Sequence, residues 1–224
     1  MKNWLETVLS EGDRPKIEAA VVAAEKKTNA EIVPMIVRRS SSAVEVNRGL
    51  FGGALVGFIV GHLVEHFAES LNVLHLPALT VLVALPASYY AILGAIFGVV
   101  MARFTPLKRY FFTKHERREA GHVRAELEFY RQKVNATQDG IGILIFISMF
   151  ERQVVVLADE TISKVLPEAT WNDVCQKVIL GLKNKALAQN LAEAISDIGR
   201  LCEPHFPAKE SNSDELANQL IVKD

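Results

Sequence analysis

Cysteine, net charge and a leader-like apolar segment are scarce in this sequence, and each scarcity excludes a class of protein. The 224 residues contain two cysteines, Cys175 and Cys202, at no metal-ligand spacing, so we expect two reduced, half-buried thiols. The formal net charge of −1 lacks the strongly basic character of nucleic-acid-binding domains, so we expect no nucleic-acid partner. The first stretch, Met1–Glu11, has no apolar core of signal-peptide length, and we expect the chain to begin in the cytoplasm.

Several catalytic motifs are also missing from the sequence. It contains no Walker loop, no dinucleotide-binding glycine fingerprint, no nucleophile elbow and no paired-cysteine zinc site. The chemistry therefore has to be sought in other residue patterns.

The sequence does contain a pair of short apolar runs, Ile141–Ile147 and Val154–Leu157, separated by the link Met149–Arg152. Short runs rich in β-branched residues are typical of strands, and the short link predicts a tight antiparallel pair. Neither run alternates between apolar and polar residues, so we expect helices to cover both faces of the sheet. Asp139 precedes the first run and Asp159 follows the second, so the pairing would bring both carboxylates to one edge.

Two long uncharged stretches, Gly49–Val64 and Ala78–Ala102, separate the first predicted strand from this pair. At about 1.5 Å per residue the second crosses the ~30 Å hydrocarbon core, and the first does so if it continues to about Phe67. The composition, 50% hydrophobic, also favours contact with lipid over a pair of core helices in a soluble protein. The sequence therefore predicts a transmembrane helical hairpin.

Small residues recur at every fourth position in both stretches, a spacing that lets helix backbones approach closely within lipid. They are Gly49, Gly53, Gly57 and Gly61 in the first, and Gly94, Gly98 and Ala102 in the second. The contact could be with the sister helix or, in a homo-oligomer, with another copy of the chain.

Basic residues flank both ends of the predicted hairpin, while its loop has Glu65 and Glu69 but no Lys or Arg. Because positive charge favours the cytoplasmic side, we expect a multi-pass inner-membrane protein of bacterial type with both termini in the cytoplasm. The flanking residues are Arg38, Arg39 and Arg48 before the hairpin, and Arg103, Lys108, Arg109 and Lys114 after it.

The rest of the chain predicts an α/β domain with a small sheet sandwiched between helices, interrupted by the hairpin. We place the first part of the domain at residues 1–48, the hairpin at 49–104 and the second part at 105–224. Apolar spacing predicts a helix from Asp13 to about Thr28, a strand at Glu31–Val37, helices at Thr113–Val134, Trp171–Lys183 and Leu187–Leu201, and a further segment at Asp214–Val222.

Two positions in these elements carry specific expectations. Pro34 lacks a backbone donor, so the strand Glu31–Val37 is expected at a sheet edge or at a bulge. The helix Thr113–Val134 is expected to pack through Val123, Leu127 and Tyr130, which share one face.

Asp139 and Asp159, together with Glu160, are the first candidate site. Carboxylates at strand ends beside a glycine-containing loop could bind a hard cation such as Ca²⁺ or Mg²⁺, which prefers oxygen ligands. Such a cation could hold a phosphate ester while Asp139 or Asp159 acted as a nucleophile or aided a water, as in a phosphatase. The alternative is structural: Asp139-Gly140 forms a turn and Asp159 caps a helix near Ile162.

His62, Glu65 and His66 form a second candidate site at the outer end of the first apolar stretch. Their His-x-x-Glu-His spacing matches one class of zinc peptidase, and Glu69 and His75 could add ligands to an external metal or proton-sensing site. The alternative is a set of interfacial polar residues that end a membrane helix.

Several segments, taken in order, resemble the TPM-domain family, which is named for a thylakoid-lumen acid phosphatase, a photosystem II repair protein and a nematode acetylcholine-receptor accessory protein. The segments are Glu25–Ile32, Asp139–Ile145, Glu151–Asp159, Trp171, His205–Pro207 and Asp214–Asn218. The similarity covers residues 10–37 and 115–222 and is closest to a bacterial branch of membrane proteins.

The resemblance implies a sheet covered by helices on both sides and, in some members, a divalent-cation site at the strand edge. By position, that site maps to Asp139-Gly140 and Asp159, while Gln138 stands where cation-binding members often have another acid. We therefore expect a membrane-anchored accessory or assembly protein whose cytoplasmic domain binds a protein partner. Metal-dependent, acid-phosphatase-like activity and external metal or proton sensing are the alternatives.

Overall fold

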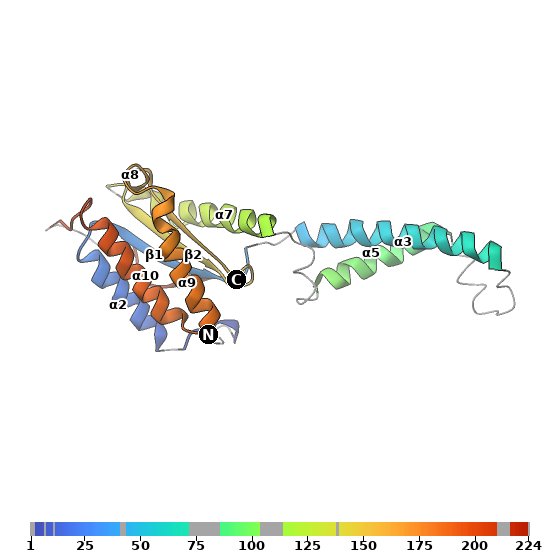
Figure 1. The fold of residues 1–224 in the computed structure, drawn as a ribbon, viewed down its shortest axis with the longest axis horizontal. Coiled ribbons are helices and arrows are strands. Elements are labelled where there is room, and N and C mark those ends of the chain that lie inside the picture. Colours follow the sequence, from blue (N-terminus) through green and yellow to red (C-terminus); the bar gives the residue numbers. More distant parts are fainter. Residues whose placement is uncertain are drawn as a thin grey trace. The chain divides into compact units, whose positions relative to one another are not determined.

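The computed structural model describes residues 3–6, 8–10, 12–40, 44–71, 86–103, 114–137, 139–209 and 216–223. The chain divides into two units, one made of Met1–Ser40 and Arg118–Asp224, the other of Ser41–Arg117. The first unit is a mixed α/β fold and the second contains a pair of helices (Figure 1).

Within the described residues, four strands form one sheet in the order β3-β2-β1-β4. β1 runs parallel to both β2 and β4, and β2 pairs with β3 in antiparallel register. β1 and β2 are buried along their whole length. For β2 this confirms the expectation drawn from the apolar run Ile141–Ile147. The strands are β1 (Glu31–Val37), β2 (Gly142–Ser148), β3 (Gln153–Ala158) and β4 (Ile221–Lys223).

Helices α2, α9 and α10 cover one face of the sheet (Figure 1). The fully buried side chains of Ile32, Ile143 and Ile145 point to this face, and burying each isoleucine contributes roughly 1.5–3 kcal/mol. The helices are α2 (Asp13–Glu25), α9 (Asn172–Asn184) and α10 (Leu187–Cys202), and the shorter elements are α1 (Asn3–Glu6), α8 (Glu160–Ser163), η1 (Val134–Ala136) and η2 (Glu168–Trp171).

Helix α7 (Lys114–Arg131) covers the opposite face, so the sheet is sandwiched between helices (Figure 1). Ala125 and Phe129 of α7 pack with Met35, Leu144 and Phe146 of the sheet in a second, smaller core. The predicted sandwich is therefore confirmed for this unit.

The predicted packing face of α7 was wrong. Val123, Leu127 and Tyr130 are 59%, 42% and 66% exposed. The buried face instead includes Gly121, whose missing side chain makes room for the Gln153 side chain of β3, and Glu128, a fully buried carboxylate. The buried face thus consists of the small Gly121 and Ala125, the aromatic Phe129 and the ion-paired Glu128, and the apolar stripe Val123, Leu127 and Tyr130 is left outside.

The prediction that Pro34 marks an edge strand or a bulge was also wrong, because β1 lies between β2 and β4 and pairs with β2 in unbroken register. The amide of Glu31 bonds the Ile141 carbonyl on the β2 side, whereas the amide of Ile32 points the other way and bonds Oε1 of Glu25. Backbone nitrogens point alternately to the two sides of a strand, so the nitrogen of Pro34 points to the same side as that of Ile32. On that side β4 pairs only with residues from Met35 onward. Proline is tolerated because no ladder bond is required of its nitrogen.

In the second unit, helices α3 (Val44–Leu71) and α5 (Ala87–Arg103) pack against each other through glycine. A Cβ added at Gly53 would lie 2.1 Å from the carbonyl oxygen of Gly94, and one added at Gly57 would lie 2.1 Å from that of Tyr90. No real side chain fits at such distances, so the contact requires glycine. The glycine repeat thus serves the contact between sister helices.

Among the described residues, α3 is the one helix long and apolar enough by length and composition to cross a membrane, through Leu50–Phe67. Helix α5 has a shorter apolar stretch, Ser88–Met101, and the predicted second span began at Ala78, in a range that lies outside the described residues up to residue 85.

Candidate functional site: an acid-bearing sheet edge

Three chain segments meet at the end of the sheet where β1 and β2 begin, which we call the acid-bearing edge. Parallel β1 and β2 both begin there, and antiparallel β3 ends there. The edge therefore gathers Asn29 before β1, Asp139 before β2 and Asp159 after β3. A Cβ built on Gly140, whose φ is 65°, would lie 3.8 Å from Oδ2 of Asp159 and 3.0 Å from Oγ1 of Thr161. The two acid-bearing segments are thus in contact, as hairpin pairing predicts.

Asp139 is held by two side chains from distant parts of the sequence. Oδ2 of Asp139 accepts a hydrogen bond from the side-chain amide of Asn29 and one from the amine of Lys209, which lies 2.6 Å away. These bonds, that of Lys209 first, hold the pKa of Asp139 below its ordinary value. The carboxyl group is 41% exposed and ionised at neutral pH.

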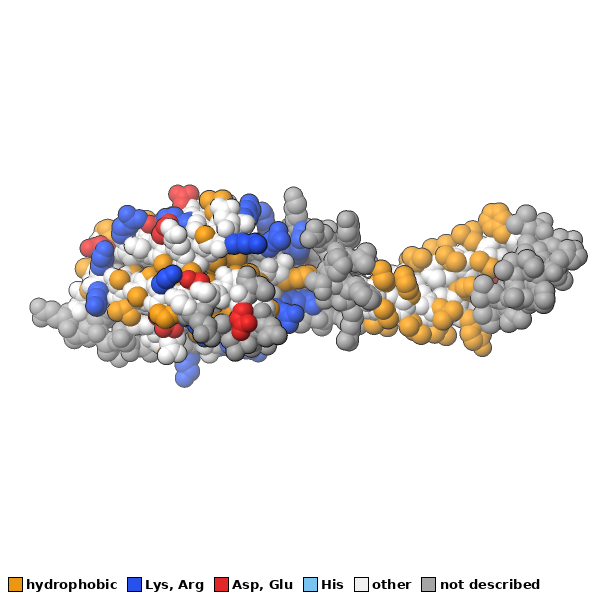
Figure 2. All heavy atoms as spheres, turned by 90° about the horizontal axis from the view of Figure 1, so that it is seen from below, with side chains coloured by type: hydrophobic (Ala, Val, Ile, Leu, Met, Phe, Trp, Pro, Cys, Tyr) orange, Lys and Arg blue, Asp and Glu red, His pale blue; other side chains and the backbone are white. Residues whose placement is uncertain are grey.

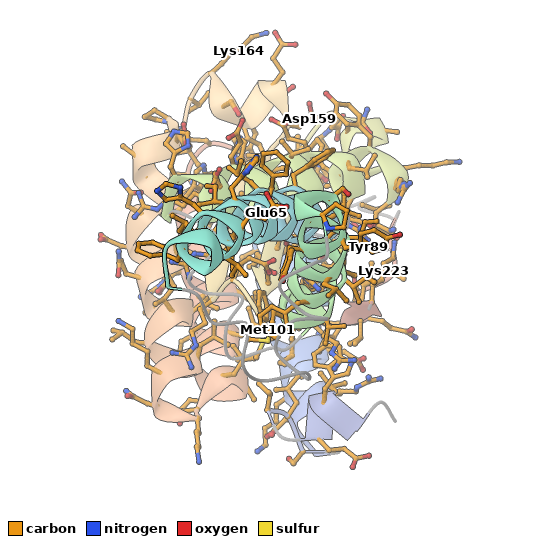
Figure 3. All side chains as sticks on the ribbon, turned by 90° about the vertical axis from the view of Figure 1, so that its right-hand side faces the viewer. Glu65, Tyr89, Met101, Asp159, Lys164 and Lys223 are labelled. Carbon is orange, nitrogen blue, oxygen red and sulfur yellow. The ribbon has the colours of Figure 1, made fainter. Side chains whose placement is uncertain are left out.

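Asp159 has a structural role at the start of α8. Its Oδ1 accepts a 2.6 Å hydrogen bond from the amide of Glu160, which makes it the N-cap of this short helix. The Glu160 side chain is 80% exposed and pairs with Lys164 at 2.9 Å, and Lys164 extends outward from this end of the unit (Figure 3). The capping interpretation of Asp159 is therefore confirmed.

Gln138, which stands where the resemblance would lead one to expect another acid, lies outside the described residues. Across the described ranges, no group of three or more His, Cys, Asp or Glu side chains is placed to hold a metal ion. A cation at this edge would need backbone carbonyl oxygens and water beside Asp139 and Asp159.

The second predicted site is brought together in part. Nδ1 of His62 lies 3.4 Å from Oε2 of Glu65, one helical turn on along α3, and the His62 ring stacks edge-on against Phe58. His75 and the side chain of Glu69 lie outside the described residues. The histidine and glutamate therefore interact, and a role in metal binding stays a prediction.

Sequence reasoning missed a buried polar cluster at the other edge of the sheet. Glu151 belongs to the short link Met149–Arg152 between the two predicted strands, and this link forms a turn with a positive φ of 51° at Arg152. Glu151 itself is only 8% exposed, and it accepts hydrogen bonds from the Ser148 hydroxyl and, at 3.1 Å, from the amide of Ser40. The sequence signal for this cluster was an acid, Glu151, three residues after Ser148, the last residue of β2.

The guanidinium of Arg39 lies beside this cluster, 5.2 Å from the centre of the Phe150 ring. Burial lowers the pKa of Arg39, and the charge of Glu151 partly opposes that shift. Glu151 and its partners therefore fix the segment that leaves β1 toward α3.

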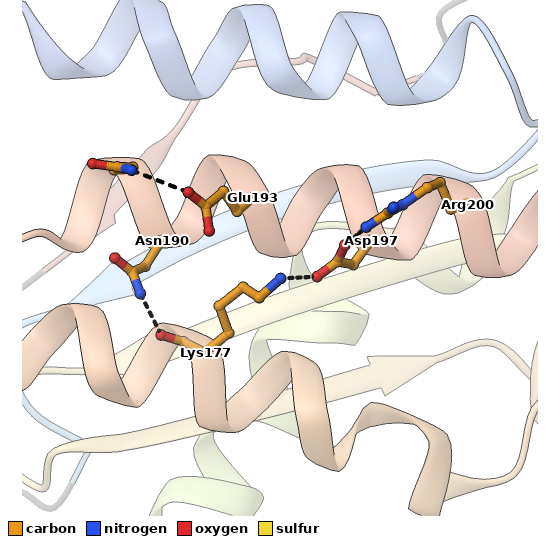
Figure 4. Close-up of polar contacts among 6 residues, drawn as sticks. Lys177, Asn190, Glu193, Asp197 and Arg200 are labelled. Carbon is orange, nitrogen blue, oxygen red and sulfur yellow. Dashed lines mark hydrogen bonds and ion pairs between the residues drawn. The ribbon is translucent and has the colours of Figure 1, made fainter.

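Two further ion-pair networks join different elements of the fold. The amine of Lys177 on α9 and the guanidinium of Arg200 both bind Asp197 on α10 (Figure 4). Burial alone would raise the pKa of Asp197, but the two cations outweigh it and lower the pKa. Lys177, Asp197 and Arg200 are among the residues that line a groove between α9 and α10. Lys177 and Asp197 lie on different helices, so sequence spacing gives no sign of their pair, whereas Arg200 follows Asp197 by three positions on α10.

The second network centres on Glu128 of α7. Its buried carboxylate binds the amine of Lys223 in β4 at 2.6 Å and the guanidinium of Arg124 at 3.0 Å. Burial would raise the pKa of Glu128, and the two cations reverse the shift and lower it. This network fastens the short strand β4 to α7.

Comparisons with known proteins inform the fold. A scan against protein-family models and a search of curated proteins each gave no match. Among solved structures, the NMR structure of the BA42 protein from the psychrophilic bacterium Bizionia argentinensis is similar, with a TM-score of 0.57 and 18% sequence identity. The match covers 96% of this chain and 95% of that one. At this identity the similarity establishes a shared fold.

Proposed function

We propose that this chain is a membrane-anchored accessory protein, in which α3 and α5 span a bilayer and a TPM-like α/β unit binds a protein partner in the cytoplasm. The observation that carries the proposal is the distribution of side chains on the helix pair. Gly53, Gly57 and Gly94 face the contact between the helices. The large apolar side chains face outward (Figure 2). In water such a surface is unfavourable, and in lipid it is satisfied.

The outward side chains cover both helices. On α3 the exposed ones include Leu50, Phe51, Leu55, Val56, Phe58, Ile59, Val60, Leu63 and Phe67, and on α5 they include Ile92, Leu93, Ile96, Phe97 and Val100. The apolar window Leu50–Phe67 is about 27 Å long at about 1.5 Å per residue, close to the thickness of the hydrocarbon core. The apolar sequence ahead of α5, from Ala78, would complete the second span.

The orientation follows from the charges that flank the hairpin. Basic residues precede α3 and follow α5, and the sequence between them has no Lys or Arg, so both termini are assigned to the cytoplasm. The α/β unit would then work on the inner side of the membrane. The term TPM-like rests on the sequence resemblance alone, and the similarity to BA42 supports the α/β fold.

A protease-protection experiment on intact spheroplasts tests this topology. With an epitope tag at the C-terminus, the tag should be protected until the membrane is permeabilised, while a protease site inserted after Ser70 should be cut from outside. A tag that is cut in intact spheroplasts would overturn the cytoplasmic assignment.

A second candidate function rests on the convergence of Asp139 and Asp159 at the sheet edge. In this proposal the two carboxylates, with Glu160, bind Ca²⁺ or Mg²⁺ and support metal-dependent hydrolysis of a phosphate ester. The amine of Lys209, 2.6 Å from Asp139, would compete with the cation for that carboxylate.

The competition makes the candidate testable. Calcium should raise the melting temperature of the Lys209→Met variant more than that of the wild type, and Asp159→Asn should abolish the rise. The phosphatase hypothesis requires that the wild type hydrolyse p-nitrophenyl phosphate and that Asp139→Asn lose this activity. Identical melting curves with and without calcium in wild type and Lys209→Met would exclude the cation site.

A further inference from the structure

Helix α7 has an exposed apolar stripe on the side opposite the sheet. The stripe consists of Val123, Leu127 and Tyr130, which are 59%, 42% and 66% exposed, with the partly buried Ala120 one turn earlier. Their spacing of three, four and three residues is that of the a and d positions of a helix-pairing seam. The seam therefore has the geometry to receive a second helix.

Charged residues of opposite sign border the two sides of this stripe. With Ala120 and Leu127 at a and Val123 and Tyr130 at d, the e positions are Arg124 and Arg131 and the g positions are Glu119 and Glu126. In a parallel pair of identical helices, each g residue faces the e residue five positions later in the partner. Glu119 would then face Arg124 and Glu126 would face Arg131, twice each by symmetry.

An antiparallel pair would bring e residues together and g residues together. Arginine would then oppose arginine and glutamate would oppose glutamate, which is unfavourable. The charge pattern thus selects a parallel arrangement of two copies of the same helix.

These charged side chains already have contacts within their own chain. Arg124 and Arg131 lie 3.0 Å and 3.7 Å from Oε1 of Glu128, and Glu126 lies 3.4 Å from His122. Glu128 keeps its bond to Lys223 when Arg131 turns outward, and Arg131 and Glu126 are 56% and 53% exposed. Glu126 of one copy can therefore pair with the exposed Arg131 of the other with little disturbance of the fold.

We propose that a second copy of this chain packs its α7 in parallel along the stripe Ala120, Val123, Leu127 and Tyr130, and that the e and g charges fix the register. About two heptads are too few for a stable pair at low concentration in solution. Confinement to one membrane, as in the proposed function, raises the local concentration and favours the pair. The geometry of the seam does not depend on that confinement.

Cysteine cross-linking of the full chain, in membranes and in detergent at high protein concentration, tests the seam. Equivalent a positions lie side by side in a parallel pair, so Leu127→Cys should give a cross-linked dimer with a short bis-maleimide. His122→Cys, exposed on the same helix but away from the seam, is the matched control, and wild type measures the contribution of Cys175 and Cys202. Equal yields at the two positions, or no dimer at Leu127→Cys, would overturn the proposal.

The Leu127→Cys variant also shows whether lipid or protein covers the stripe on α7. If Leu127→Cys is shielded from a water-soluble maleimide by anionic vesicles while no dimer forms, the stripe contacts lipid and the proposal is wrong. Shielding that accompanies cross-linked dimer, with or without anionic lipid, supports it. A soluble chain that still dimerises through Leu127→Cys would refute the membrane proposal and keep this one.

Charge exchange tests the register. Glu126→Arg and Arg131→Glu should each weaken dimerisation roughly tenfold, and an equimolar mixture of the two variants should recover wild-type affinity within about threefold. Circular dichroism melting of each variant checks the fold, since Arg131 also contacts Glu128. Unchanged dimerisation in Glu126→Arg, or no recovery in the mixture of folded variants, would overturn the parallel arrangement.

Discussion

The amine of Lys209 lies 2.6 Å from Oδ2 of Asp139, although the two residues are 70 positions apart in the sequence. With Asn29, this pair ties together the segments before β1, before β2 and after α10 at one edge of the sheet. The sheet edge predicted from the sequence as a cation site is thus also a place where side chains from distant segments bind one another.

This pair predicts a specific dependence of stability on pH. Because its folded-state pKa is lowered from 3.8, Asp139 contributes stability above that pH, and the contribution is lost as the pH falls through the folded value. Asp139→Asn should therefore melt below wild type at neutral pH, and the two curves should converge in acid. The difference should shrink in high salt because the group is exposed. A constant difference down to acid pH would contradict this account.

The buried pair of Glu128 and Lys223 predicts a larger effect. Lys223→Met removes one of the cations that neutralise a fully buried carboxylate, and we expect a loss of roughly 1–3 kcal/mol in the free energy of unfolding. Lys164→Met, at an exposed helical pair with Glu160, should cost less than about 0.5 kcal/mol. Urea unfolding of both variants provides the measurement, and equal effects would show that the buried pair is unimportant.

The glycine contact between α3 and α5 predicts different effects at two positions on α3, Gly57 and Gly52. At Gly57 a side chain would collide with the backbone of Tyr90 in α5, whereas a Cβ at Gly52 meets nothing within 4 Å. Gly57→Leu should therefore separate the helices and Gly52→Leu should not. Spin labels at Leu55 and Ile96 report the separation. The seam as described is wrong if both variants keep the wild-type distance.

Cys202 should be unreactive in the folded protein. Burial raises its pKa to about 12, so almost no thiolate is present at about pH 8, and the side chain is fully buried. Iodoacetamide should modify it only after unfolding in urea, as read by mass spectrometry of the tryptic peptides. The half-buried Cys175 is the internal comparison. Rapid alkylation of native Cys202 would contradict its placement in the core.

The strands and the larger helices were predictable because each has its own local signal. The strand Glu31–Val37 was predicted with its observed bounds, and the run Ile141–Ile147 is shifted by one residue from β2. β4 overlaps the end of the predicted segment Asp214–Val222 but was not recognised as a strand, since its three residues are held by pairing with Met35–Val37 and not by local preference. Elements that depend on a distant partner leave no periodic pattern.

The same distinction explains the candidate site. The proximity of Asp139 and Asp159 follows from hairpin geometry and was visible in the sequence. The partners Asn29 and Lys209 come from separate segments, and sequence spacing could not place them there. The face of α7 was mistaken because the stripe with three apolar residues was assumed to point inward, whereas the buried face combines small residues, Phe129 and the paired Glu128.

Alkaline carbonate extraction of membranes from cells that produce the full chain tests the central claim most directly. A hairpin embedded in lipid predicts that the protein stays in the membrane pellet and leaves it only with detergent. Recovery of the chain in the carbonate supernatant, as a monomer that needs no detergent, would contradict the membrane anchor and the function built on it.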